Sequence, residues 1–291
     1  MLVTIPGQIP ILDGVVEVLR GPVGSAREAT ALLVGPTESV GVAAITSMPN
    51  LQVVAVAGSG TDAVDAAALE ARGIRLVCAP EATVAPTAEL TLALMLMVSR
   101  GIPKAVSQLE SGAWDGWSFD HVVGRGIAGL TLGLVGHGRI GQRVARLARA
   151  CEMTVIFHTR SGSIGADYRP HLSDLLGEAD IVSLHVPLTF QTRGLLDAEA
   201  IGKMRRGAAL INTSRGGVVD EAAVLAALRS GHLSGAGFDV FAAEPHTPSE
   251  LLGVENLVVT PHIGTATIAA RESMVLEAAT NLLAALRISQ S

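Results

Sequence analysis

The sequence predicts an α/β protein of two domains, one built on a doubly wound parallel sheet and the other a smaller α/β lobe. Its 291 residues exceed the roughly 100 to 200 residues that one folded domain usually contains. Hydrophobic residues make up 49% of the chain and charged residues 16%, a balance typical of large buried cores and not of disorder. From Leu130 onward, short apolar runs alternate with segments of helical period, which indicates βαβ units.

The larger sheet is predicted to contain six strands, each of them a short apolar run. A helix over residues 220–229 separates the fourth strand from the fifth, since Asp220 can cap its N-terminus and Gly231 can end it. Six strands with helices between them predict a doubly wound domain. The strands are expected at residues 130–135, 153–158, 180–185, 208–213, 235–240 and 256–260.

The smaller lobe shows a weaker βα rhythm, with apolar runs at residues 31–34, 51–57 and 74–78. The tail over residues 268–288 has apolar residues at helical spacing and therefore needs a partner surface. We expect this tail to pack back on the first lobe. Residues 107–126 are rich in glycine and tryptophan and are expected to be irregular toward their end.

Composition excludes several classes of function. The net charge of −6 without a basic run argues against a nucleic-acid partner. The most apolar stretch, 90–98, is about half as long as a membrane-spanning helix and predicts a buried helix, not a membrane protein. No basic residue precedes Arg20, so no secretory signal is expected. Cys78 and Cys151 lack the spacing of metal ligands and are predicted to be reduced core thiols, which suits the cytoplasm; no metal site is predicted.

A glycine motif follows the first strand of the larger sheet. The segment Gly136-His137-Gly138-Arg139-Ile140-Gly141 is a GxGxxG that opens a helix with a buried apolar stripe. In this context the first glycine takes a tight turn, the second lets the backbone approach a pyrophosphate, and the third permits close helix packing. The motif predicts a dinucleotide site; a simple glycine turn is the alternative.

The end of the second strand bears on the choice of cofactor. An acidic residue about 20 positions after the motif would bind the ribose 2′-hydroxyl of NAD, and the sequence has none there. It has Thr159-Arg160-Ser161 instead, a guanidinium and two hydroxyls suited to a 2′-phosphate. NADP(H) is therefore the preferred cofactor, with NAD(H) accepted as well. The alternative is that Arg160 is only a solvated loop residue.

Three further polar residues follow the fourth, fifth and sixth strands. They are Arg215, Glu244 and His262. Ligands of such sheets bind beyond the carboxyl ends of the strands, so an arginine, a carboxylate and a histidine are expected to share one crevice. Taken singly, Arg215 could form a surface ion pair, Glu244 could be solvated, and His262 could be a structural residue at a strand end.

Several ordered motifs resemble the D-isomer-specific 2-hydroxyacid dehydrogenase family. The resemblance covers about 200 residues. It departs from the family at His137, at the missing ribose carboxylate and in an N-terminal region shorter than usual. The motifs are Gly58 to Asp62, Ala88 to Leu94, the glycine motif, His185-Val186-Pro187-Leu188-Thr189, Asn212 to Gly217, Gly235 to Phe241, Glu244-Pro245 and Thr260 to Gly264.

The resemblance implies an organisation and a set of roles. A Rossmann coenzyme domain would span residues 98–264, and a discontinuous flavodoxin-like substrate domain would span 1–97 and 265–291. Arg215 would bind the substrate carboxylate, His262 would be the acid/base and Glu244 its partner, while Ser59 and Gly60 would contact substrate. Members are usually homodimers through the coenzyme domain. The cofactor contacts would be Gly136, His137, Gly138, Arg139, Ile140, Gly141, Thr159, Arg160, Ser161, His185, Pro187, Thr192, Thr213, Ser214, Asp239 and Gly264.

The expected reaction is hydride transfer between NAD(P)H and a small 2-keto acid or D-2-hydroxy acid. Glyoxylate or hydroxypyruvate reduction is preferred, because Thr159-Arg160-Ser161 resembles NADPH-preferring reductases of that kind. A dimeric NAD(P)-sensing regulator without turnover is the rival from another class. Phosphite oxidation and 3-phosphoglycerate oxidation are less favoured, the latter because no regulatory domain follows. Formate oxidation is disfavoured by the glutamate at position 244.

Overall fold

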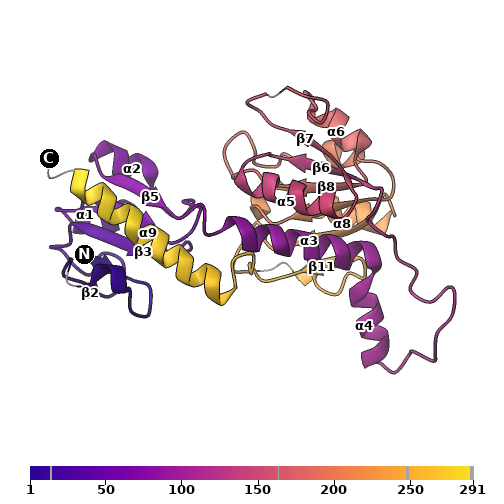
Figure 1. Ribbon diagram of the computed structural model, residues 1–291, viewed down its shortest axis with the longest axis horizontal. Coiled ribbons are helices and arrows are strands. Elements are labelled where there is room, and N and C mark those ends of the chain that lie inside the picture. Colours follow the sequence, from indigo (N-terminus) through magenta and orange to yellow (C-terminus); the bar gives the residue numbers. More distant parts are fainter. Residues whose placement is uncertain (14, 163, 247–248, 289–291) are drawn as a thin grey trace. The chain divides into compact units, whose positions relative to one another are not determined.

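The computed structural model describes residues 1–13, 15–162, 164–246 and 249–288 and divides the chain into two compact units. One unit comprises Met1–Val84 and Thr265–Ser291, and the other comprises Ala85–Gly264. Residues 289–291, the end of the segment expected in the substrate domain, lie outside the described residues. Figure 1 shows the elements of each unit along the chain.

The smaller unit contains a five-stranded parallel sheet in the order β2-β1-β3-β4-β5. This is the flavodoxin-like order, as predicted. The three apolar runs form β3, β4 and β5, whereas β1 and β2 were not predicted because two residues give no periodic signal. Its elements are β1 (Leu2–Val3), η1 (Pro10–Leu12), β2 (Leu19–Arg20), β3 (Ala31–Val34), α1 (Val42–Ser47), β4 (Val53–Val56), α2 (Ala66–Ala71), β5 (Arg75–Cys78) and α9 (Ile268–Ile288).

Helix α9 lies on the sheet of the smaller unit (Figure 1). Leu282 is fully buried in one cluster with Val3, Leu33 and Val53. Small side chains, among them Ala278 and Ala279, occupy much of the contact. Leu276, one of the apolar residues of the predicted helical tail, is 53% exposed and does not belong to this buried cluster.

The larger unit contains a six-stranded parallel sheet in the order β11-β10-β9-β8-β6-β7. A single parallel bridge between Phe157 and Tyr168 adds a one-residue strand beyond β7. With it, the chain winds outward through β7 and then crosses to β8 on the other side of β6. This reversal is the switch point of a doubly wound sheet, so the fold predicted for this domain is confirmed. The strands are β6 (Thr131–Val135), β7 (Thr154–His158), β8 (Ile181–Leu184), β9 (Ala208–Asn212), β10 (Leu233–Phe238) and β11 (Leu257–Val259).

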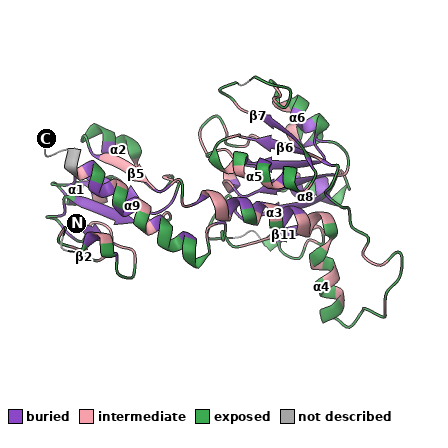
Figure 2. Ribbon diagram, viewed as in Figure 1, coloured by how far each residue is buried: buried purple, intermediate pink, exposed green. Residues whose placement is uncertain are grey.

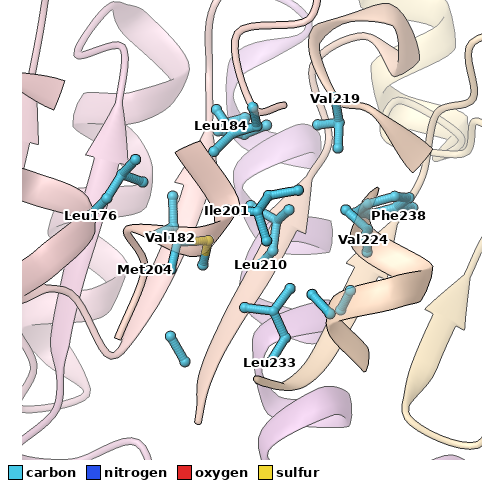
Figure 3. Packing of buried hydrophobic residues seen from close by; sticks show 14 of the residues in the cluster. Leu176, Val182, Leu184, Ile201, Met204, Leu210, Val219, Val224, Leu233 and Phe238 are labelled. Atoms are coloured by element: carbon cyan, nitrogen blue, oxygen red, sulfur yellow. The ribbon is translucent and has the colours of Figure 1, made fainter. Parts of the chain in front are cut away.

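Helices cover both faces of this sheet and enclose two apolar cores. Figure 3 shows the core between the sheet and α7 and α8, where Ile201, Leu210 and Phe238 are almost fully buried. The second core contains Leu132, Val144 and residues of α3. The helices are α3 (Val84–Arg100), α4 (Ile102–Glu110), α5 (Arg139–Ala150), α6 (Leu172–Glu178), α7 (Ala198–Gly202) and α8 (Glu221–Arg229), with short turns η2 (Gly216–Val218) and η3 (Ser249–Leu251).

Helix α3 belongs to the larger unit, whereas the sequence placed residues up to 97 in the smaller one. Ala88, Leu94 and Met95 are buried in the core with strands of the larger sheet. A continuous helix packed on one core moves as part of that core, so the boundary lies at Val84 and not at residue 97. The expected buried helix over 90–98 is part of α3.

Helix α4 leaves the core and is followed by irregular chain to Leu130 (Figure 2). The predicted irregular segment 107–126 thus begins as helix and loses regular structure at Ser111. Among the described residues, no single helix is long and apolar enough to cross a membrane; α3 and α4 meet the length and composition test only together, and they are bent by 66° at their junction.

Candidate active site

The glycine motif forms the turn between β6 and α5. Gly136 has a φ of +95°, and a Cβ there would lie 2.4 Å from the carbonyl oxygen of His185. A Cβ on Gly141 would lie 2.4 Å from the carbonyl oxygen of Gly136. Among the residues that the structure describes, and apart from its chain neighbours, nothing lies within 4 Å of a Cβ on Gly138, the N-cap of α5. The fold of the chain therefore requires glycine at positions 136 and 141. Gly138 instead leaves open space at a helix N-terminus, which is a place suited to a pyrophosphate.

His137 within the motif packs on the second strand. Its ring stacks on Phe157 with centroids 4.0 Å apart and planes 20° apart. Burial, and next the charge of Arg149, lower the pKa of His137, while Asp167 opposes them. His137 thus packs on β7 and fixes the turn against that strand.

The segment Thr159-Arg160-Ser161 follows β7 on the surface. The Arg160 Nη1 donates a hydrogen bond of 2.6 Å to Oε1 of Gln191, in the loop after β8. The hydroxyl of Thr159 bonds the carbonyl of Gly162 at 3.2 Å. Arg160 is exposed, and its guanidinium is directed toward the loop after β8.

His185 and Thr192 bound the loop that follows β8. The His185 Nε2 lies 2.9 Å from the Ser183 hydroxyl, and burial, with a smaller effect of His137, lowers the pKa of His185 to about 3. The Thr192 hydroxyl donates to the carbonyl of Pro187 at 2.5 Å. Both side chains therefore bond to the protein itself and shape the loop from within.

The loop carrying Arg215 is built by its neighbours after β9. Asn212, fully buried, accepts hydrogen bonds from the Ser214 backbone and hydroxyl at 3.0 and 2.8 Å and donates to the carbonyl of Arg215 at 2.9 Å. The Thr213 hydroxyl pairs with that of Thr91 at 2.9 Å. A Cβ on Gly216 would lie 1.8 Å from the backbone carbon of Phe241. The loop after β9 and the loop after β10 therefore touch.

Asp239 organises the segment that follows β11. It is 1% exposed, and burial raises its pKa although its hydrogen bonds oppose this. Its Oδ1 accepts from the Thr260 hydroxyl at 2.6 Å and the Ile263 nitrogen at 2.8 Å, and its Oδ2 accepts from the Gly264 nitrogen at 2.8 Å. These bonds hold His262, which has a φ of +52°, in place.

Glu244 and His262 form a direct pair. The His262 Nδ1 lies 2.7 Å from Oε2 of Glu244, while Oε1 of Glu244 accepts from the Phe241 nitrogen at 2.9 Å. Strands β9, β10 and β11 are neighbours in the sheet, so Arg215, Glu244 and His262 follow the carboxyl ends of adjacent strands. A carboxylate bonded to one ring nitrogen fixes the tautomer and leaves the other nitrogen for proton transfer.

Comparison with known proteins decides the family. Residues 92–264 match the profile described as the D-isomer specific 2-hydroxyacid dehydrogenase, NAD binding domain. The chain belongs to this family. The larger unit is its NAD-binding domain, and the predicted family resemblance is confirmed.

Characterised relatives include enzymes of two named activities. The chain is 40% identical over 268 residues to a glyoxylate reductase of Thermococcus litoralis, a match covering 89% of this chain and 81% of that protein. It is also 40% identical over 280 residues to a D-3-phosphoglycerate dehydrogenase of Mycobacterium bovis, covering 92% of this chain but only 52% of that protein. The chain thus spans about half the length of these phosphoglycerate dehydrogenases.

A solved structure reproduces the whole fold. The TT0316 protein of Thermus thermophilus matches with a TM-score of 0.89 and 41% identity, covering 98% of this chain and 96% of that one. Both α/β units of this 2-hydroxyacid dehydrogenase family member therefore have counterparts in one known chain.

Ser59 and Gly60, the substrate contacts expected in the smaller unit, follow β4. Ser59 is exposed and Gly60 half-buried, immediately after the buried Gly58. A Cβ on Gly58 would lie 3.0 Å from Pro36, so this turn is close-packed on the β3 side. It stands at the carboxyl end of its sheet, where open α/β sheets bind ligands.

Three residues that shape the site were missed from the sequence. Asn212 was seen only as part of a motif, Thr260 only as a strand end, and Gln191 not at all. Buried asparagine after a strand is a signal for a loop-building side chain, because its amide must find partners. Nothing in the sequence around Gln191 indicates its contact with Arg160, since the two lie 31 positions apart.

Proposed function

We propose that this family member transfers hydride between NAD(P)H and a small 2-keto acid or D-2-hydroxy acid. The observation that carries the proposal is the Glu244–His262 pair at 2.7 Å, on a segment beside the loop that carries Arg215. A histidine oriented by a carboxylate, at the same edge of the sheet as an arginine, is suited to protonate a carbonyl whose carboxylate is held.

The chain's own residues supply binding and proton transfer. The bound nicotinamide supplies or accepts the hydride. The guanidinium of Arg215 would bind the substrate carboxylate with its planar fork and polarise the carbonyl. His262 would give its Nε2 proton to the carbonyl oxygen during reduction and take it back during oxidation. Glu244 holds Nδ1 and stabilises the charged imidazolium, as a carboxylate beside a catalytic histidine does.

Glyoxylate or hydroxypyruvate is the substrate we propose for reduction. The relative from Thermococcus litoralis, named a glyoxylate reductase, supports it. The test is a panel of glyoxylate, hydroxypyruvate and pyruvate with NADPH and NADH, with His262→Gln as the inactive reference. His262→Gln should lower turnover about 10²- to 10⁴-fold without loss of cofactor binding. Tight cofactor binding with no turnover on any substrate would instead support a sensor.

Oxidation of a phosphorylated D-2-hydroxy acid is a second candidate. It is favoured by the 40% identity to a D-3-phosphoglycerate dehydrogenase over 280 residues. Including 3-phosphoglycerate with NAD⁺ and NADP⁺ in the panel separates the two. A kcat/KM for 3-phosphoglycerate above that for glyoxylate would reverse our preference.

NADP(H) is the cofactor we propose, with NAD(H) accepted as well. Gly138 faces open space at the N-terminus of α5, and Arg160 is aimed across the end of the sheet toward Gln191. A guanidinium there would bind a 2′-phosphate that a carboxylate would repel. Arg160→Ala should raise the KM for NADPH about tenfold or more, the loss of one charged hydrogen-bonding group, with a smaller effect on NADH. An unchanged KM for NADPH would refute the preference.

A homodimer through the coenzyme domain, in the cytoplasm, stays our prediction for assembly and location. Helix α4 has no buried residue, and after it Trp117 is 75% exposed and Phe119 90% exposed, with ring centroids 4.8 Å apart. Clustered exposed aromatic rings favour an interface, and two-fold dimers are the commonest assembly. Light scattering should give twice the 29.9 kDa chain mass, and Trp117→Asp should shift it toward the monomer.

A further inference from the structure

The contact between Arg160 and Gln191 joins the loops that follow β7 and β8, the two strands that flank β6 in the larger sheet. Arg160 stands two residues after β7, and Gln191 lies in the loop after β8. Their side chains are connected by a 2.6 Å hydrogen bond from Nη1 to Oε1. Both loops leave carboxyl ends of strands, on the side where the glycine motif opens. The bond therefore orients the guanidinium at the proposed cofactor site.

The loop that presents Gln191 is cross-linked by its own hydrogen bonds. The Thr189 nitrogen donates to the Thr192 hydroxyl at 2.8 Å, and the Thr192 nitrogen donates to the Thr189 carbonyl at 3.2 Å. The Thr192 hydroxyl donates in turn to the Pro187 carbonyl at 2.5 Å. Gln191 is thus held in a closed turn and offers its amide at a defined place. A partner fixed in this way reduces the rotamer freedom that Arg160 must lose on binding an anion.

The chemistry of glutamine at this place is specific. Its amide oxygen accepts a hydrogen bond from a guanidinium but carries no charge, so the full charge of Arg160 remains to attract an anion. A glutamate at position 191 would neutralise Arg160 and repel a phosphate dianion at the same time. An apolar residue would leave the guanidinium undirected. Glutamine alone among these three orients the charge and preserves it.

We propose that Gln191 is a positioning residue that determines cofactor specificity: its neutral amide holds Arg160 ready for the 2′-phosphate of NADP(H). This inference rests on the proposed role of Arg160 in cofactor binding. It assigns to the loop after β8 a share in choosing between NADP(H) and NAD(H), which would otherwise be attributed only to the residues that end β7.

The test measures binding of two adenosine fragments by calorimetry, so it does not depend on turnover. Adenosine 2′,5′-bisphosphate carries the discriminating phosphate, and adenosine 5′-monophosphate lacks it. The variants are Gln191→Glu, Gln191→Leu, Arg160→Ala and the double variant Arg160→Ala/Gln191→Leu. Gln52→Glu, at an exposed glutamine of the smaller unit, introduces the same charge elsewhere and is the control. Repeating the titrations at low and high salt measures the screened electrostatic part.

Gln191→Glu should weaken binding of the bisphosphate about tenfold or more, because the new carboxylate neutralises Arg160 and repels the phosphate. Gln191→Leu should weaken it roughly threefold, because the guanidinium of Arg160 is then no longer oriented. The monophosphate affinity should change less than about twofold in both, as should all affinities of Gln52→Glu. In the Arg160→Ala background, Gln191→Leu should have no further effect, since coupled residues do not add.

Two results would overturn the inference. If both fragments weaken alike in the Gln191 variants, the loop shapes the site without reading the phosphate. If Gln191→Leu adds its full effect to Arg160→Ala, Gln191 does not act through Arg160. The proposed NADP(H) preference fails separately: in that case Arg160→Ala itself leaves the bisphosphate affinity unchanged.

Discussion

His262 and Glu244 are joined by a 2.7 Å contact between Nδ1 and Oε2, and the second carboxylate oxygen of Glu244 is bonded to the Phe241 nitrogen at 2.9 Å. Each oxygen thus has one partner, one in the ring and one in the backbone of the loop after β10. The imidazole orientation is therefore tied to the same loop that touches Gly216, next to Arg215. All three proposed catalytic residues are thus connected to the segment around Phe241.

Glu244→Gln should lower kcat without abolishing cofactor binding. The amide can still accept from the Phe241 nitrogen but no longer stabilises a charged imidazolium. Loss of a hydrogen bond to a charged group costs about 1.5 to 3 kcal/mol, or about 10- to 100-fold in rate. Glu221→Gln is the matched control, because Glu221 accepts from the neighbouring Ala242 nitrogen at 2.7 Å. Equal losses of kcat in both variants would show that only the loop, and not the imidazole, is affected.

Gly216→Ala should destabilise the larger unit and damage substrate binding. The added Cβ would lie 1.8 Å from the backbone carbon of Phe241, and backbone cannot yield as a side chain can. Overpacking of this kind costs about 1 to 3 kcal/mol, which lowers the Tm by several degrees. The Cβ of Gly217→Ala would meet side chains and no backbone, Leu188 at 3.2 Å and Arg193 at 3.6 Å, so this variant should be milder. Thermal unfolding and the KM for the 2-keto acid measure both effects; a Tm equal to that of Gly217→Ala would contradict the contact.

Most of the architecture could be predicted from the sequence because buried parallel strands are recognisable as apolar runs. All six predicted strands of the larger sheet are present, with ends within two residues of those expected, since parallel strands buried on both faces are continuous apolar runs. The predicted N-cap Asp220 accepts from the Ala223 nitrogen at 3.1 Å. Local chemistry, namely apolar runs and caps, was sufficient here.

Contacts between loops could not be predicted in this way. The bridge of Tyr168 to Phe157 supplies the outer strand of the doubly wound order with a single residue, too short for any periodicity. The bond from Arg160 to Gln191 and the approach of Gly216 to Phe241 depend on tertiary distance, which spacing along the chain does not encode. The sequence could place Glu244 and His262 at neighbouring strand ends, but only the folded structure gives their 2.7 Å contact.

Acid should destabilise the fold through His185. Burial lowers the pKa of His185 from the ordinary value of 6.5 to about 3. Between pH 6.5 and about pH 3, His185 is protonated in the unfolded chain but not in the folded one. The contribution to stability is therefore complete above pH 6.5 and falls as the pH drops toward 3. At pH 5 the resulting loss in the free energy of unfolding is at most about 2 kcal/mol. The loss is smaller than this limit because His185 is only half-buried.

Urea unfolding at pH 7.5 and pH 5 checks this loss. His185→Gln should have a smaller difference in unfolding free energy between the two pH values than the unsubstituted protein, because glutamine can bond Ser183 without titrating. His171→Gln, at an exposed histidine, is the control and should keep the original difference. If the His185 variant keeps it as well, another group is responsible for the acid sensitivity.

Gly138→Ala separates folding from cofactor binding. In the described part of the chain, beyond its two neighbours in sequence, nothing lies within 4 Å of the Cβ it would add, whereas the Cβ of Gly141→Ala would lie 2.4 Å from the Gly136 carbonyl oxygen. Gly138→Ala should therefore change the free energy of unfolding by no more than about 1 kcal/mol, the usual cost of alanine at an N-cap. Its methyl group instead occupies the approach to the α5 N-terminus, so NADPH affinity should fall about tenfold or more. Gly141→Ala should lose stability even without cofactor. If Gly138→Ala bound NADPH as tightly as the unsubstituted protein, the pyrophosphate would have to bind away from this turn, and the assignment of the glycine motif would fail.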